Sequence, residues 1–180
     1  MIYYTADLHF GHANAIKYDK RPLTSVAEMD QLLIDNWNGR VTDNDTVYIL
    51  GDVCFRSKYP ASWYLNQLKG HKVLIVGNHD SQILADEESM ECFDEIADIL
   101  QIKDGDRKIC LCHYPLASWN GDAYGSWHVY AHIHLQKNDA YEFMKKKERA
   151  LNAGCMINNY VPVTFEEMIE NNRKFQKEEG

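Results

Sequence analysis

Polar residues that can bind metal ions or transfer protons follow five predicted strands of this sequence. They are Asp7 and His9, Asp52, Asn78 with His79 and Asp80, His113, and His132 with His134. The Asp-x-His and His-x-His pairs have alternate spacing, which on extended backbone turns both side chains to the same side. Two ligands from one segment can therefore reach one ion.

The donor types and their number indicate a site for two ions. Asp, Asn and His without sulfur suit borderline divalent metals, among them Mn, Fe, Zn, Co and Ni. A carboxylate such as that of Asp52 can bridge two ions about 3.5–4 Å apart, the separation found in two-metal hydrolases. One ion cannot use all the candidate ligands, which are Asp7, His9, Asp52, Asn78, His113, His132 and His134. We therefore predict two divalent metal ions.

Apolar patterns and capping signals predict the elements that position these residues. Strands are predicted at 2–5, 46–50, 72–76, 96–102, 108–112 and 127–130, with further strands between 141 and 155. Capping boxes start helices at Ser25 and at Thr164, and Pro60 suits the first turn of another. The order is β-α-β-α-β, then mostly strands, then a helix, which favours a sandwich of sheets with helices outside. No repeat or linker interrupts the chain, so residues 1–180 are predicted to form one domain.

Composition restricts the partners and the compartment. The net charge of −8 should repel nucleic acid and anionic membranes, although two bound divalent ions would cancel half of it. The five cysteines are odd in number and lack C-x-x-C spacing, which indicates reduced thiols. The start of the chain lacks signal-peptide features, and no apolar run is long enough to cross a bilayer. We expect a cytoplasmic protein without a membrane partner, and its oligomeric state stays open.

The motifs D-x-H, G-D, G-N-H-D, H and H-x-H, in this order, resemble those of the calcineurin-like metallophosphoesterase superfamily. The run D-L-H-F-G-H at 7–12, followed by Asn14 and Arg21, is similar to small prokaryotic and phage members. The resemblance covers essentially the whole chain. It implies an α/β fold of the α+β type, built as a four-layer α-β-β-α sandwich. Two mixed sheets would be flanked by helices, with a dinuclear metal site at the carboxyl ends of the strands.

The resemblance also implies ligands and roles. One ion would take Asp7, His9, Asp52 and His134, and the other would take Asp52, Asn78, His113 and His132. His79 would act on the substrate phosphate as a general acid or charge stabiliser, and Asp80 would orient His79. Candidate substrate-binding residues are His12, Asn14, Arg21 and Arg56. Phe55 is a departure, because the protein-phosphatase branch has there an aspartate that would partner the catalytic histidine.

These roles predict a dinuclear metal-dependent phosphoric ester hydrolase, with manganese expected to serve in vitro. Hydroxide activated by both ions would attack a small phosphomonoester or phosphodiester, and His79 would protonate the departing oxygen. One alternative is a nuclease, for which Lys145 to Lys147 and Arg149 form the concentrated basic patch. Another is a non-catalytic binding module of the same fold, which the complete set of ligands disfavours.

Overall fold

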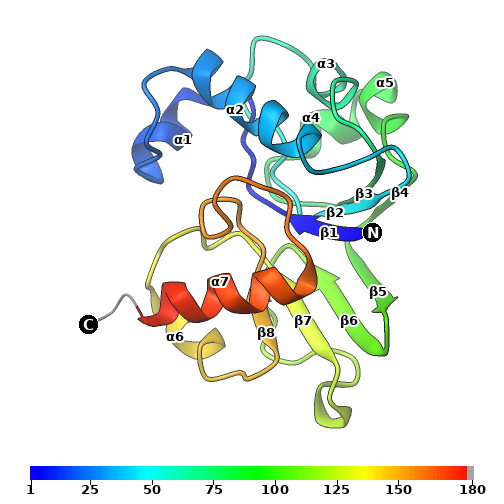
Figure 1. Cartoon of the computed structure of the whole chain (residues 1–180), viewed down its shortest axis with the longest axis vertical. Coiled ribbons are helices and arrows are strands. Elements are labelled where there is room, and N and C mark those ends of the chain that lie inside the picture. The colour runs from blue at the N-terminus through cyan, green and yellow to red at the C-terminus, as the bar shows by residue number, and fades with distance from the viewer. Residues whose placement is uncertain (178–180) are drawn as a thin grey trace.

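The computed structural model describes residues 1–177, which form two four-stranded sheets with helices around them (Figure 1). The first sheet has the order β1 (Ile2–Thr5), β2 (Thr46–Ile49), β3 (His71–Ile75) and β4 (Glu95–Ala97), and all its pairs are parallel. The second has the order β5 (Ile99–Asp104), β6 (Arg107–Cys112), β7 (Trp127–Tyr130) and β8 (Ala150–Asn152). Only its β5–β6 pair is antiparallel. The prediction of two mixed sheets is therefore correct for the second sheet alone. Residues 178–180 of the predicted domain lie outside the part of the chain that the structure describes.

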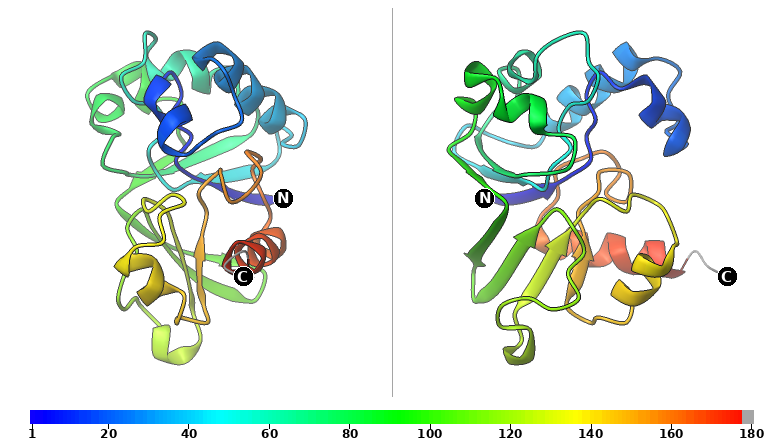
Figure 2. Two further views of the ribbon diagram at one scale, coloured as in Figure 1. Left: turned by 90° about the vertical axis from the view of Figure 1, so that its left-hand side faces the viewer. Right: turned by 180° about the vertical axis from the view of Figure 1, so that it is seen from behind.

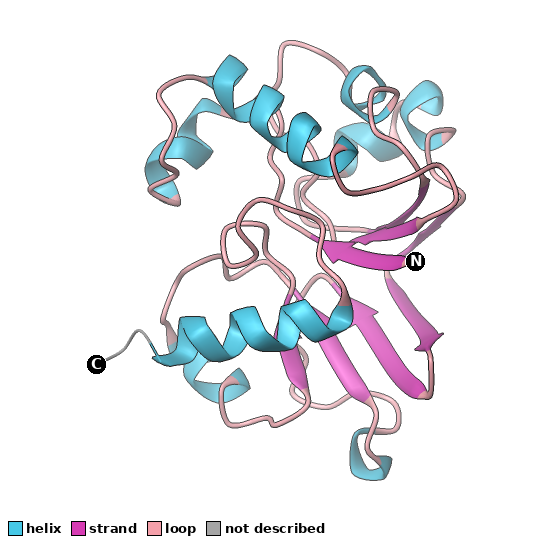
Figure 3. Ribbon diagram, in the orientation of Figure 1, coloured by secondary structure: helices cyan, strands magenta, loops and turns pink. Residues whose placement is uncertain are grey.

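Helices connect the strands of the first sheet, as parallel pairing requires. They are α1 (Ala13–Tyr18), α2 (Val26–Asn38), α3 (Ala61–Leu65), α4 (Ser81–Leu84) and α5 (Glu87–Met90). All five lie on the side of the first sheet that faces away from the second, as three directions of view agree (Figures 1 and 2). The other half holds η1 (Asp122–Tyr124), α6 (Asp139–Met144) and α7 (Phe165–Lys177) (Figure 3). Within residues 1–177, every helix is too short or too polar to cross a membrane.

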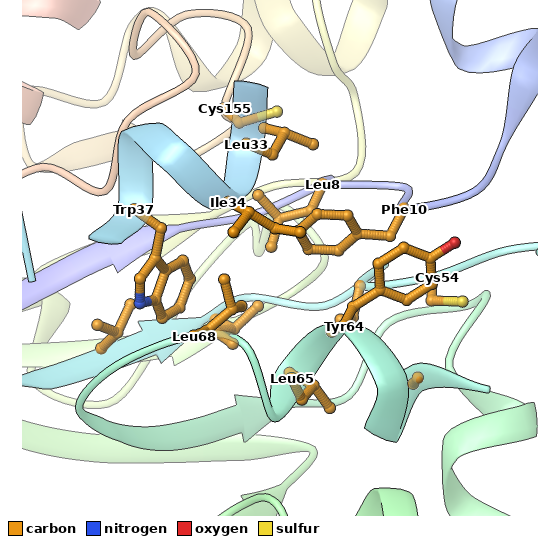
Figure 4. Close-up of a cluster of buried hydrophobic side chains, with 14 of the residues drawn as sticks. Leu8, Phe10, Leu33, Ile34, Trp37, Cys54, Tyr64, Leu65, Leu68 and Cys155 are labelled. Atoms are coloured by element: carbon orange, nitrogen blue, oxygen red, sulfur yellow. The ribbon is translucent and has the colours of Figure 1, made fainter. Parts of the chain in front are cut away.

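Helix α2 shows how the sequence builds the outer layer. The backbone N–H of Glu28 donates to the Ser25 side chain at 3.2 Å, as the predicted capping box requires. Its buried residues, among them Leu33 and Trp37, are spaced so that they share one face. Figure 4 shows Ile34 and Trp37 of that face turned toward Phe10 and Leu68. Helix and sheet thus bury a common apolar cluster.

A second apolar cluster fills the space between the sheets, and a third covers the outer face of the second sheet. Leu50, directly after β2, and Ile75 of β3 lie in this cluster together with Leu111 of β6 and Val129 of β7. Phe165 at the start of α7 completes this cluster. The third cluster joins the second sheet to α6 and includes Trp119, Tyr130, Tyr141 and Met144. The three clusters therefore lie, in turn, between the outer helices and the first sheet, between the two sheets, and between the second sheet and α6.

Three segments differ from their prediction. The predicted strand 96–102 is divided at Asp98, because β4 pairs in the first sheet and β5 in the second. Helix α6 occupies part of the segment where strands were expected, since Asn138 caps it by accepting from the N–H of Tyr141 at 3.1 Å. Helix α1 forms in a segment for which neither a helix nor a strand was predicted. The predicted strand 108–112, by contrast, is confirmed as part of β6.

Candidate metal centre

The loops that follow β1 and β2 run side by side, which brings Asp7, His9 and Asp52 together. The N–H of Asp7 donates to the carbonyl of Gly51 at 3.1 Å, and the N–H of His9 donates to the carbonyl of Asp52 at 3.0 Å. These bonds continue the parallel pairing of β1 with β2 beyond the ends of the strands. Side chains from two neighbouring strand ends therefore share one location.

Five of the predicted ligands have left-handed backbone conformations. Their φ angles are 54° at Asp7, 53° at His9, 55° at Asp52, 71° at His132 and 51° at His134. Residues with a Cβ rarely adopt this region, and each costs roughly 1–3 kcal/mol when the surroundings impose it. Such strain is concentrated at functional sites. The occurrence of such strain at five residues that lie together therefore indicates a functional site at this end of the molecule.

Asp7, His9, Asp52 and His134 form the first donor set, with one ligand atom from each lying within 4.8 Å of the others. The Nε2 atoms of His9 and His134 are 3.3 Å apart, and Nε2 of His9 is 3.7 Å from Oδ2 of Asp52. Nε2 of His134 is 3.8 Å from Oδ1 of Asp7. The Asp7, His9 and Asp52 side chains are buried and His134 is partly buried. This set could hold a metal ion.

The unpartnered atoms of the first set fit a cation. Both carboxylate oxygens of Asp7 are buried without a hydrogen-bond partner. A buried polar group in this state costs about 1–3 kcal/mol, and more when it is charged. Burial raises the pKa of Asp7 to about 6 and lowers that of His9 to about 2. At neutral pH the carboxylate is ionised and the imidazole is neutral, the states in which both can bind a metal.

Asn78, His113 and His132 form the second donor set around the same Asp52. Nε2 of His113 lies 3.0 Å from Oδ1 of Asn78 and 3.7 Å from Oδ2 of Asp52, and Nδ1 of His132 lies 2.8 Å from Oδ1 of Asn78. Nδ1 of His113 is 2.6 Å from the carbonyl of Leu50, which can only accept. In the neutral ring Nε2 therefore presents its lone pair to two further acceptors. A cation placed among them would bind the lone pair of His113 Nε2 and the facing oxygens of Asn78 and Asp52.

Asp19 supports the first set, and sequence reasoning missed it. Its Oδ1 lies 2.6 Å from Nδ1 of His134, and Arg21 donates to its Oδ2 at 3.0 Å. Burial is the largest single effect and opposes both charges, but the mutual hydrogen bond and the nearby charges together outweigh it, so the pKa of Asp19 is lowered and that of His134 is raised. A carboxylate on Nδ1 turns Nε2 of a histidine toward a metal. No sequence motif indicates a role for Asp19, because the two residues are distant in the sequence and only folding brings Asp19 next to His134.

Arg21 has a different position from the one predicted. Its guanidinium is buried and donates to the carbonyls of Leu8 at 2.8 Å and Asp7 at 2.9 Å. With the bond to Asp19, these contacts hold the loop that carries Asp7 from behind. Arg21 therefore supports the loop that carries Asp7, and it does not line the cavity beside the first donor set.

Asp80 also has a different role from the predicted orientation of His79. Its buried carboxylate accepts from the backbone N–H groups of Gly77 at 2.8 Å, Asp52 at 2.9 Å and Val53 at 3.0 Å. Both oxygens of the carboxylate accept from backbone donors, and these bonds join the loop after β3 to the loop after β2. Asp80 is thus a positioning residue for Asp52.

Gly77 is required for space, although the sequence suggested that its backbone freedom mattered. Its φ is not positive. A Cβ at this position would lie 2.5 Å from Oδ1 of Asp52 and 2.7 Å from the Asp52 backbone nitrogen. The missing side chain lets the two loops approach closely.

A cavity of about 270 Å³ opens beside the first donor set. Its lining includes His79 and three predicted substrate-binding residues, His12, Asn14 and Arg56. The ring of Phe55 packs on that of His79 with centroids 4.0 Å apart. Burial and the neighbouring charges of His79 and Arg56 lower the pKa of His12. Tyr18, 77% exposed at the rim, was missed by the sequence analysis because its helix was not expected.

Comparison with known proteins places the chain among relatives of unassigned function. No protein-family model matches it. It is 34% identical over 171 residues to the uncharacterized protein MJ1445 of Methanocaldococcus jannaschii, and the match covers 94% of this chain and 89% of that protein. The chain belongs to the MJ1445 family.

Solved structures extend the MJ1445 family fold to another organism. A protein of unknown function from Aquifex aeolicus, AQ665, superposes with a TM-score of 0.73 and 25% identity over 94% of this chain and 98% of its own. An archaeal structure described as a novel phosphodiesterase superposes with a TM-score of 0.46 and 16% identity, over 85% of this chain and 81% of its own. The descriptions of MJ1445 and AQ665 assign no activity.

Proposed function

We propose that this member of the MJ1445 family is a phosphoesterase that uses two divalent metal ions. The observation that carries the proposal is the convergence of buried acceptors on both sides of Asp52. Asp7 contributes two carboxylate oxygens without partners. His113 contributes a lone pair that faces Asn78 and Asp52. Acceptors gathered without donors are stable only with cations between them.

The residues around Asp52 divide between two ions. Asp7, His9, Asp52 and His134 would hold one, and Asp52, Asn78, His113 and His132 would hold the other. Ions bound there would lower the pKa of water and withdraw charge from phosphoryl oxygens. Asp19 keeps the proton of His134 on Nδ1, so that Nε2 is available as a ligand.

His79 is the general acid of this proposal. Its backbone N–H donates to Oδ1 of Asp52 at 2.9 Å, which fixes the residue beside the donor sets. Its ring lines the cavity and is held from one side by Phe55. From this position the imidazolium donates a proton to the leaving oxygen of the ester, after which the neutral ring is reprotonated from solvent.

Arg56 and His12 bind the phosphoryl group in the same cavity. Both line it together with Asn14. The Arg56 guanidinium can donate two parallel hydrogen bonds to phosphate oxygens, and a ring N–H of His12 provides another donor. The cavity of about 270 Å³ accommodates a small phosphate ester, either a monoester or a diester.

Metal content and hydrolysis test the proposal together. Protein purified without chelator should contain about two divalent ions per chain, as a shared carboxylate between two donor sets implies. With added Mn²⁺ it should hydrolyse p-nitrophenyl phosphate, bis-p-nitrophenyl phosphate or both. Asp52→Asn should lose the ions and the turnover, whereas Asp106→Asn, in the exposed β5–β6 turn, should keep both. A protein that binds no ion and hydrolyses neither ester would contradict the proposal.

A further inference from the structure

Aromatic and basic side chains alternate in the loop that leaves the candidate metal centre. Phe55 and Arg56 are followed by Lys58 and Tyr59, and Trp63 follows on α3. Arg56, Lys58 and Tyr59 are exposed, and Arg56 lies with Cζ 5.2 Å from the Phe55 ring centroid. This local composition differs from that of the chain, whose net charge is −8.

Tyr59 and Trp63 form an exposed stacked pair. Their ring centroids are 4.5 Å apart with an interplanar angle of 18°, and the two residues are 41% and 45% exposed. The Lys58 ammonium lies 5.3 Å from the Tyr59 centroid. The buried Tyr64 meets Trp63 edge-on at 4.8 Å from behind. One rigid aromatic surface with a cation at its edge is therefore presented outward.

The loop is held in place, so this surface is already formed. The Ser57 hydroxyl is 2.7 Å from that of Tyr64 and accepts from the N–H of Tyr59 at 3.0 Å. Gly11 leaves the space that Ser57 occupies, because a Cβ there would lie 2.3 Å from the Ser57 side chain. A preformed surface binds without the entropic cost of ordering.

A second cavity, of about 410 Å³, adjoins the cavity beside the metal centre. Tyr59, Trp63 and Lys58 line it. Gly11 lines the second cavity whereas the next residue, His12, lines the first. In the same way Arg56 lines the first and Lys58 the second. Neighbouring residues of the same two segments thus line the two cavities.

We propose that Lys58, Tyr59 and Trp63 form a platform for single-stranded nucleic acid. A base stacks on the Tyr59–Trp63 pair, and the adjoining phosphate passes Lys58 and Arg56 toward His79. Stacked aromatic rings flanked by cations are the means by which proteins hold single strands without reading their sequence. The proposal rests on the proposed function for the cleavage of the strand, whereas the binding itself depends only on the platform.

The basic run at 145–149 has one exposed ring beside it and, among the described residues, no stacked exposed pair. Lys147 lies 5.8 Å from the centroid of the exposed Phe143 and 5.3 Å from that of the buried Trp119, and it forms an ion pair with Asp122 at 3.3 Å. It belongs to the part that covers the second sheet, away from the ligand loops. The nuclease alternative is thus better supported by the platform than by the lysine run that first suggested it.

Binding of a labelled oligothymidylate of eight nucleotides tests the platform. Phosphorothioate linkages protect the probe from hydrolysis, and fluorescence anisotropy gives the dissociation constant for the metal-loaded protein. Trp63→Ala should weaken binding about tenfold, in line with the measured cost of losing one stacking side chain. Trp63→Phe should recover most of the affinity. Tyr124→Ala, which removes a 94% exposed tyrosine lining a different cavity, should bind like the wild type.

Salt dependence and a second aromatic variant complete the test. Lys58→Gln should reduce the slope of log affinity against log salt by about 0.7, the contribution of one phosphate contact on a single strand. Tyr59→Ala should weaken binding by the same order as Trp63→Ala. If the wild type does not bind the oligonucleotide, or if the Trp63 and Tyr59 variants bind as well as Tyr124→Ala, the platform is refuted.

Hydrolysis of bis-p-nitrophenyl phosphate by the same preparations separates the two proposals. Turnover of this small diester with no effect of Trp63→Ala on oligonucleotide affinity would retain the phosphoesterase and remove the platform. Binding that depends on Trp63 without turnover of any ester would do the reverse.

Discussion

The carboxylate of Asp80 holds the backbone of Asp52 by accepting its N–H at 2.9 Å. The same carboxylate accepts from Gly77 and Val53, so that the loop after β3 is tied to the loop after β2 directly below the donor sets. Asp52 is the residue that both sets share. Its position therefore depends on a neighbour that contributes no donor atom to either set.

Asp80→Asn is expected to weaken metal binding while leaving the ligands in place. An asparagine offers one acceptor oxygen, and its NH₂ group would face a backbone N–H that now has no partner. Losing hydrogen bonds to a buried charge costs about 1.5–3 kcal/mol of the free energy of unfolding. Metal affinity should fall about 10–100-fold, the range for residues that support ligands. Isothermal titration with Mn²⁺ and chemical denaturation measure the two quantities.

The exposed Asp106→Asn, in the turn between β5 and β6, is the matched control for Asp80→Asn and should change neither quantity. If Asp80→Asn kept full metal affinity and stability and lost only the turnover assigned to His79, the original prediction that Asp80 orients His79 would be restored.

Asp7→Asn should uncouple stability from metal binding. Without a cation, the buried carboxylate of Asp7 has no partner for either oxygen, so its removal relieves an unfavourable charge. We expect the metal-free variant to be at least as stable as the metal-free wild type. The wild type should gain about 2.7 kcal/mol at a Mn²⁺ concentration a hundred times the Kd, and the variant should gain much less.

Thermal unfolding with and without Mn²⁺ measures both effects of Asp7→Asn. The exposed Asp43→Asn serves as control and should behave as the wild type does. A strongly destabilised metal-free Asp7→Asn would mean that this carboxylate stabilises the fold by itself.

Asp19→Asn tests the support of His134. The carboxylate lies 2.6 Å from Nδ1 of His134, and its loss leaves the ring free to turn or to change tautomer. We expect metal affinity to fall about 10–100-fold, since carboxylates that orient a ligating histidine have effects of this size. Asp19→Glu should recover part of it. Equal affinities for wild type and Asp19→Asn in a competition assay with a chelating dye would show that His134 is oriented by the backbone alone.

The sequence predicted which donor residues lie together better than it predicted the residues that support them, and the reason is physical. Asp7 and Asp52 follow apolar strands, so the parallel pairing of β1 with β2 places them together once the strands are known. Asp19, Arg21 and Asp80 act through contacts between distant loops, and the direction of such side chains follows from no periodicity. Arg21 was a candidate for substrate binding, yet it is buried against two carbonyls.

The same difference between local signals and distant contacts explains which parts of the fold could be predicted. The strand ends and both capping boxes could be read locally, because apolar runs and cap residues are local signals. The transfer of the chain between sheets at Asp98 could not, since Ile96 and Ile102 continue one apolar pattern across it. The partners of β4 and β5 decide where one strand ends, and partners are not a local property.

The ring of Phe55 lies 4.0 Å from that of His79, measured between their centroids. A carboxylate would hold the imidazole by a hydrogen bond, whereas Phe55 holds it by packing, and we infer that it is a positioning residue for His79. Phe55→Ala should lower kcat for bis-p-nitrophenyl phosphate about tenfold with little change in KM, because a displaced proton donor affects the transition state more than substrate binding. Phe55→Leu should recover part of the rate by refilling the space, and the exposed Phe143→Ala should have no effect. A larger KM with unchanged kcat would instead assign Phe55 to substrate binding, and His79 would then be held by its backbone contact with Asp52 alone.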